Sequence, residues 1–118
     1  MHVMGVILPV PEENEDRYLA MAESMAEIFM DYGALEVMEC WESDISDGVQ
    51  TDFRKAVAAQ PGEKIVFSWA IWPDKAAADS AHEAMMQDER MQGPPEDMPF
   101  DGKRMIFGGF RSILAKGR

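Results

Sequence analysis

The amino-acid sequence predicts an α+β protein of the ferredoxin-like type, with the element order βαββαβ and two helices on one face of a four-stranded antiparallel sheet. Two segments, 13–32 and 74–90, repeat apolar residues at the spacing of one helical face. Four further segments carry the apolar patterns of strands: 2–10, 34–44, 63–72 and 103–114. Because βαβ crossovers are right-handed, we expect the strand order 4-1-3-2, with the two most apolar strands in the centre.

Composition limits the class of protein. The chain has 118 residues, of which 47% are hydrophobic and 28% charged, as expected for one globular domain over residues 1–118. Its net charge of −11 disfavours a nucleic-acid partner or an anionic membrane, since both are bound by Lys and Arg. No apolar run reaches the ~20 residues of a membrane span, and the start lacks a secretory pattern. With Cys40 as its single cysteine, the protein is expected in the cytoplasm.

The first strand, 2–10, is apolar on both of its alternating faces, which is typical of a central strand. Even-numbered residues from Met4 to Val10 point to one face, and Val3 and Ile7 point to the other. Prolines at its end stop the strand, because proline cannot donate to the ladder.

The first helix, 13–32, carries an apolar stripe from Tyr18 to Tyr32. Acidic residues crowd its start, where carboxylates interact favourably with the positive end of the helix dipole. Gly33 follows at the position where a left-handed backbone commonly ends a helix.

The second strand, 34–44, is expected at a sheet edge, because charged side chains protect an edge from pairing with other chains. Within it, Glu36 and Glu39 point to opposite faces. The connection that follows, 45–62, is long, and a short helix is predicted inside it at 53–59. A connection of this length is usually functional or mobile.

The remaining elements complete the second βαβ unit. Asp74 caps the second helix, which is expected to run to about residue 90 and to stop at the Gly-Pro-Pro sequence of 93–95. The last strand, 103–114, contains two glycines at 108–109, which predict a bulge or a point of close approach.

The sheet face opposite the helices is also apolar, on the first, third and fourth strands. A patch of that breadth is not tolerated on a soluble monomer. The simplest cover is a second copy of the chain, packed sheet to sheet about a two-fold axis. The alternative is that connection 45–62 folds back over the sheet, although one loop could hide only part of this face. The sequence therefore predicts a homodimer through the sheet face.

Several segments are similar, in order along the chain, to a known bacterial family. They are Leu8-Pro9-Val10-Pro11, Gly33-Ala34-Leu35-Glu36, Glu39-Cys40, Phe67-Ser68-Trp69, Met98-Pro99-Phe100-Asp101-Gly102-Lys103-Arg104-Met105 and Gly108-Gly109-Phe110. Together they resemble the uncharacterised YbaA-like family, a domain of unknown function within the dimeric α/β-barrel superfamily. The resemblance implies this fold and a homodimer, and it implies no activity. The family usually has an acidic residue where this chain has Met4, so a family site that needs this carboxylate would be incomplete.

Five residues are candidates for binding a ligand: Glu36, Glu39, Trp69, Asp101 and Arg104. The two glutamates and the arginine lie in strands beside an apolar sheet, where a charge is costly unless it is paired. In one interpretation these three charged residues form a structural ion pair or are simply exposed at the sheet edge. In the other, one of them lines a cavity between the sheet and the helices. Trp69 could stack on a planar ligand, although such residues more often belong to the core.

The run 98–105 is the most site-like segment. Its Asp101-Gly102 turn places Lys103 and Arg104 at the start of the last strand. In one interpretation Asp101 caps the turn and pairs with Arg104, which holds the strand in register. In the other, Arg104 points to the mouth of the barrel and binds an anionic group through its guanidinium fork. We favour the structural interpretation.

No metal or cofactor is expected, because the cysteine and the two histidines are scattered without ligand spacing. Cys40 is interpreted as a small packed side chain. His82 stands between Ala81 and Glu83 at the solvent side of its helix, so it is interpreted as a surface residue. The haem-degrading branch of the superfamily uses an asparagine on the first strand, where Met4 or Val6 stands here, which disfavours haem.

Two hypotheses of function remain. The first is a small-molecule enzyme or ligand-binding barrel, for instance a cofactor-independent oxygenase of the kind that the superfamily includes. The second is a non-catalytic dimeric module for binding or regulation. A closed pocket with a buried carboxylate or arginine would favour the first hypothesis, and a filled core would favour the second.

Overall fold

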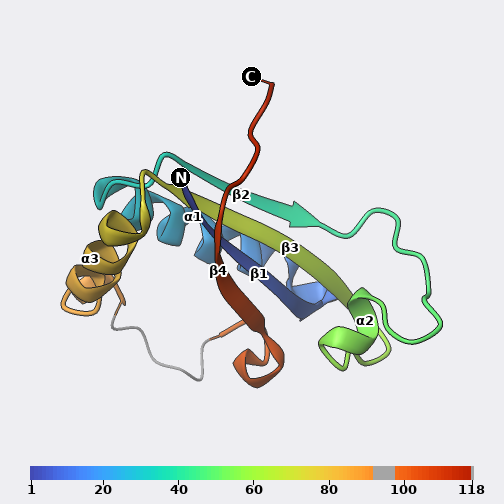
Figure 1. The fold of residues 1–118 in the computed structure, drawn as a ribbon. Coiled ribbons are helices and arrows are strands. Elements are labelled where there is room, and N and C mark those ends of the chain that lie inside the picture. Colours follow the sequence, from blue (N-terminus) through green and yellow to red (C-terminus); the bar gives the residue numbers. More distant parts are fainter. Residues whose placement is uncertain (92–97, 118) are drawn as a thin grey trace.

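The computed structural model describes residues 1–91 and 98–117. It has one antiparallel sheet in the order β2-β3-β1-β4, which is the predicted order read from the other edge (Figure 1). The strands are β1 (His2–Pro11), β2 (Glu36–Trp41), β3 (Glu63–Trp72) and β4 (Ile106–Arg111). The longer helices are α1 (Glu15–Asp31) and α3 (Lys75–Met85). This arrangement confirms the α+β, ferredoxin-like prediction.

Both longer helices pack on the same face of the sheet, here called the helix side. From α1, Tyr18 and Ala22 form a core cluster with Leu8 of β1 and Val66 of β3. A second cluster joins Ile28 of α1 to Trp72 of β3 and to three residues of α3. The core therefore lies between the sheet and the two helices, as the alternation in β1 predicts.

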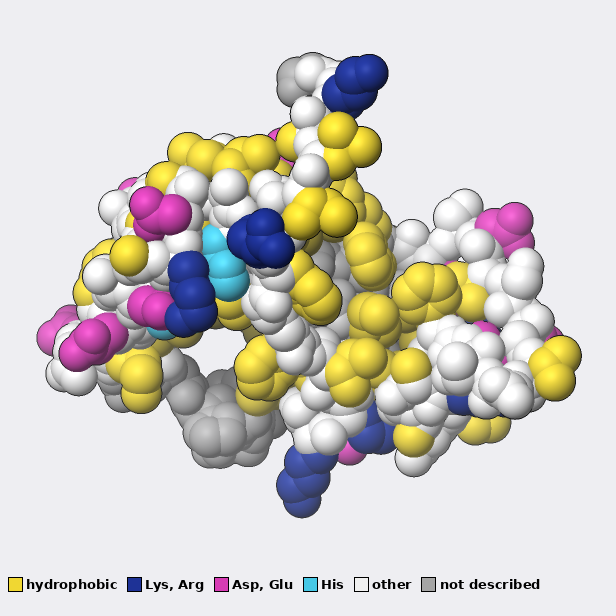
Figure 2. Space-filling model, viewed as in Figure 1, with side chains coloured by type: hydrophobic (Ala, Val, Ile, Leu, Met, Phe, Trp, Pro, Cys, Tyr) yellow, Lys and Arg dark blue, Asp and Glu magenta, His cyan; other side chains and the backbone are white. Residues whose placement is uncertain are grey.

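The described residues cover the opposite face of the sheet, here called the outer face, at one end only. There the short helix α2 (Phe53–Ala56) packs edge to face on Phe67, and Ile65 and Val57 are both buried. Connection 45–62 thus folds back over part of this face, but Phe67 remains 43% exposed. In Figure 2, hydrophobic side chains gather over β3 and β4.

The first half of the chain follows the predicted pattern, with shifted ends. A single 3-10 turn, Glu12–Asn14, precedes α1, and β2 is shorter at both ends than predicted. Gly33 ends α1 with a positive φ of 107°, as the C′ position requires.

The second helix is shorter than predicted, because α3 ends at Met85 and a 3-10 turn follows at Glu89–Met91. Asp88 holds the chain where α3 ends. Its backbone N–H donates to the Met85 carbonyl, and its carboxylate accepts a 2.8 Å hydrogen bond from Tyr32. The predicted stop at 93–95 lies outside the described residues. The predicted cap is present, since the Asp74 side chain accepts from the Ala77 N–H at 2.7 Å.

The last strand is also shorter than predicted, because Gly102–Arg104 form a 3-10 turn before β4. Its glycines mark a close approach and not a bulge. The register with β1 is continuous, with Gly108 opposite Gly5 and Gly109 opposite Met4. A Cβ atom added at Gly109 would lie 2.8 Å from Nε2 of His2, so the His2 ring would have to move to admit a side chain there.

His82 is not the simple surface residue that the sequence suggested. It is half-buried, its ring lies 5.7 Å from that of Trp72, and its Nδ1 lies 2.6 Å from the Ala78 carbonyl oxygen. Among the described residues, no helix has the length and apolar character needed to cross a membrane.

Candidate functional site

A cavity of about 650 Å³ lies between α1 and the helix side of the sheet, and we call it the helix-side cavity. The alternation of β1 and the apolar stripe of α1 supply most of its walls, because both turn their apolar side chains to this layer. Methionines and aromatic residues dominate the lining, including Met4, Met21, Met25, Phe29, Phe100 and Met105. The side chains of residues 1–91 and 98–117 therefore do not fill the core on this side of the sheet, and they leave the cavity open to solvent.

Three polar side chains meet in the cavity wall: Tyr18, Glu39 and Ser68. Glu39 on β2 lies directly opposite Ser68 on β3, and both point to the helix side. The Tyr18 hydroxyl, from the first turns of α1, donates a 2.6 Å hydrogen bond to Oε1 of Glu39. The Ser68 side chain also hydrogen-bonds to this carboxylate. Two hydroxyl groups therefore orient the carboxylate from two different elements.

The environment of Glu39 is drier than bulk water, although a ligand could still reach it. Desolvation raises the pKa of Glu39 above its usual value, and the hydrogen bonds from Tyr18 and Ser68 oppose this rise. Tyr18 and Ser68 are each only 6% exposed, whereas Glu39 keeps an exposed surface. A carboxylate that is partly desolvated and still exposed fits a position in the wall of an open cavity.

The other two candidates on the sheet, Glu36 and Trp69, meet on the outer face. The indole Nε1 of Trp69 donates a 2.9 Å hydrogen bond to Oε2 of Glu36. Trp69 also packs edge to face on Phe67, at 5.7 Å between ring centroids. The structure therefore brings Glu36 and Trp69 together, and it separates their contact from Glu39 by the thickness of the sheet.

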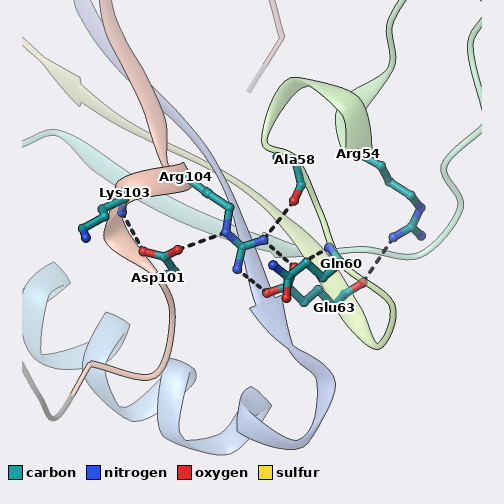
Figure 3. A network of polar contacts seen from close by, with 7 residues as sticks. All are labelled: Arg54, Ala58, Gln60, Glu63, Asp101, Lys103 and Arg104. Atoms are coloured by element: carbon teal, nitrogen blue, oxygen red, sulfur yellow. Dashed lines mark hydrogen bonds and ion pairs between the residues drawn. The ribbon is translucent and has the colours of Figure 1, made fainter.

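Arg104 lies at the centre of a polar network at the end of the sheet (Figure 3). Its two terminal nitrogens each donate to one carboxylate oxygen of Glu63 at 2.7 Å, which is the bidentate geometry. Its Nε donates to Asp101 at 3.1 Å, and one terminal nitrogen also donates to the Ala58 carbonyl at 3.0 Å. The hydrogen bonds from Arg104 hold the pKa of Glu63 below its usual value.

This network supports one wall of the helix-side cavity. Phe100 and Met105, on either side of the Asp101–Arg104 turn, both line the cavity and pack on the core. The Phe100 ring lies edge to face on Tyr18, at 5.9 Å between centroids. Arg104 itself is outside the described cavity lining, and its contacts favour the structural interpretation of this turn.

Sequence reasoning missed Tyr18, Ser68 and Arg90 as parts of the site. Arg90 lines the cavity and pairs with Asp31 of α1 and with Asp88, at 2.8 Å in each case. No spacing pattern connects these residues, because Tyr18 and Glu39 are 21 positions apart and come together only through packing. Among residues 1–91 and 98–117, no group of three His, Cys, Asp or Glu side chains is placed to hold a metal ion.

Comparison with known proteins places the chain in a family. The family described as "Protein of unknown function (DUF1428)" matches residues 1–102. The chain belongs to this DUF1428 family. Proteins named "Uncharacterized protein YbaA" from Escherichia coli (strain K12) and from Shigella flexneri are 50% identical to it over 113 residues, which cover 96% of this chain and 97% of each relative. This confirms the resemblance to the YbaA-like family. Neither the family description nor the names of these relatives state an activity, and the helix-side cavity is the feature that bears on function.

Proposed function

We propose that this DUF1428 protein binds a small, largely apolar organic molecule in the helix-side cavity, with Glu39 as the polar anchor. The observation that carries the proposal is the meeting of Tyr18, Glu39 and Ser68 in the wall of an otherwise apolar cavity of about 650 Å³. Cavities of roughly 300–1,000 Å³ with a few convergent polar groups are typical of small-molecule sites.

The lining supports a ligand of variable shape. Methionine side chains are flexible and polarizable, so a wall rich in them adapts to different apolar surfaces. The carboxylate of Glu39 is an acceptor, so the polar end of the ligand is expected to present an N–H, an O–H or an acidic C–H group to it. The unfilled cavity supports this function over the non-catalytic regulatory module, for which a filled core was expected.

The neutral fluorophore N-phenyl-1-naphthylamine tests the proposal, because it is apolar, carries one N–H donor and is not repelled by the acidic protein. We expect saturable binding with increased fluorescence. Ala26→Phe fills the cavity from α1 and is expected to reduce the affinity at least about tenfold. The matched control is Ala20→Phe, on an exposed face of the same helix, which should bind as the wild type does. Equal binding by both variants would contradict the proposal.

The proposal includes a homodimer of the dimeric α/β-barrel type, in the cytoplasm, that buries the outer face. A second hollow of about 710 Å³ on this face is lined almost entirely by apolar residues of β1, β3 and β4. Phe110 and Ile106 of β4 are 61% and 42% exposed there. An apolar surface of this extent supports burial against a second copy of the chain.

A further inference from the structure

We propose that Glu39 is a general base, which removes a proton from a carbon atom of a carbon acid bound in the helix-side cavity. The ligands of this class carry a C–H bond next to an electron-withdrawing group, as ketones, lactones and thioesters do. The inference rests on the proposed function, because the cavity must first admit the ligand.

The geometry around Glu39 suits a base. An ionised carboxylate has about four acceptor positions, and Tyr18 and Ser68 occupy two of them in the free protein. The rest of the side chain is exposed where the cavity opens to solvent, and the nearby wall is made mostly of apolar groups, so the carboxylate is only partly desolvated. A less solvated carboxylate removes protons more readily than one in bulk water.

Tyr18 and Ser68 act as positioning residues. Both hydroxyls belong to buried side chains, and they approach the carboxylate from α1 and from β3. Two fixed donors on separate elements restrict the rotamers of Glu39, so the carboxylate stays aimed at the ligand.

The reaction needs no cofactor. In a ketone, the α C–H bond breaks, its proton goes to the Glu39 carboxylate, and its electron pair forms the C=C bond of an enolate whose oxygen takes the negative charge. Return of the proton to the same or to another carbon completes an exchange or an isomerisation. Atoms and electrons balance without an oxidant or a reductant.

The reaction rate should depend on the ionisation of Glu39. Among the described residues, the groups that face this carboxylate are Tyr18 from α1 and Ser68 from β3, and Arg90 is a further charged residue of the cavity wall. Since the base must be ionised, the rate should rise with pH through the pKa of Glu39. Desolvation raises this pKa, so the inflection should lie above the ordinary value of about 4.3 for a glutamate.

The test uses 5-nitrobenzisoxazole, a small apolar carbon acid. A base removes the proton from its C3 atom, the electron pair forms a nitrile as the N–O bond breaks, and the oxygen leaves as a coloured phenolate. We expect turnover by the wild type above the rate of acetate at equal carboxylate concentration. Glu39→Gln should lower the rate about 100-fold or more, because it keeps the shape and removes the base.

The matched control is Glu36→Gln, on the same strand but on the outer face, which should keep the wild-type rate. Tyr18→Phe should retain turnover and move the pH inflection upward, because Tyr18 stabilises the charged form of Glu39. Melting curves check that each variant is folded, and Glu39→Asp should recover part of the rate.

The outcomes separate the two proposals. Displacement of N-phenyl-1-naphthylamine by the probe, without turnover above acetate, would overturn the role of Glu39 as a base and leave ligand binding intact. Equal turnover by the wild type and by Glu39→Gln would also overturn the role of Glu39 as a base and leave ligand binding intact. If neither compound binds saturably, the proposed function and this inference both fail.

Discussion

Glu39 and Arg104 are both charged side chains beside the sheet, and their partners give them different roles. Arg104 donates to two carboxylates and a backbone carbonyl, so most of its guanidinium hydrogen bonds are made within the protein. Glu39 accepts hydrogen bonds from two neutral hydroxyl groups, and it forms no ion pair among the described contacts. A partly desolvated carboxylate that no described cation neutralises is typical of functional residues.

Arg104→Lys should lower the free energy of unfolding by about 1–3 kcal/mol, because an ammonium group cannot reproduce the bidentate contact with Glu63. Urea unfolding measures the change. Lys103→Gln, at the exposed neighbouring position, is the control and should change stability little. An Arg104→Lys variant as stable as the wild type would show that the network does not hold this turn.

The ion pair between Glu63 and Arg104 also makes the free energy of unfolding depend on pH. The pKa of Glu63 is lower in the folded protein than in the unfolded chain, so the contact with Arg104 stabilises the fold above a pH of about 4.3. This stability is lost as the pH falls through the folded-state pKa. The difference in stability between wild type and Arg104→Lys should therefore narrow in acid.

At the level of elements, α3 shows that a local signal sets where a helix begins. The Asp74 side chain satisfies the N–H of Ala77, one of the donors that have no partner inside the helix. The end of α3 depends instead on Asp88, whose partner Tyr32 belongs to α1. For this reason the start was predictable from the sequence and the end was not.

Asp74→Ala should destabilise the protein by about 1 kcal/mol, because the capping hydrogen bond to Ala77 is lost. Thermal and urea unfolding measure this cost. The control is Asp79→Ala in the same helix, which breaks only an exposed ion pair with Lys75 and should cost about 0.5 kcal/mol or less. Equal effects of the two substitutions would argue against the cap.

At the level of the whole molecule, no described residue covers the outer face beyond its α2 end. Side chains of β4 are exposed on both sides of this edge strand, with Phe107 at 68% and Phe110 at 61%. An apolar edge strand next to an apolar face is a surface on which chains associate. The cavity and this face lie on opposite sides of one sheet, so a dimer could leave the cavity accessible.

Light scattering during size exclusion should report twice 13.3 kDa at micromolar protein concentration. Phe110→Asp should yield the 13.3 kDa species, because a charge buried unpaired between two sheets is strongly unfavourable. Leu19→Asp is the control: Leu19 is similarly exposed, at 52%, but lies on α1. A wild-type protein that elutes as a monomer would remove the dimer from the proposed function.

Periodicity in the sequence predicted the strands, the longer helices and their order correctly. The alternation in β1 and the stripe of α1 are local properties, and each one decides which face of its element is buried. The same alternation placed Glu36 and Glu39 on opposite faces of β2, where the structure has them. It could not show that only one of these carboxylates meets a cavity.

By itself, the sequence determined the fold class and the strand order, because apolar spacing, caps and turn residues act over a few positions, and its matching segments indicated the family. Only the tertiary structure decided that Tyr18 reaches Glu39, that Arg104 pairs with Glu63, and that the core beside α1 is left open. These features depend on contacts between residues that are 21 and 41 positions apart. Such contacts depend on how side chains from separate elements pack against each other. The local sequence pattern does not show whether those side chains fill the space between the elements.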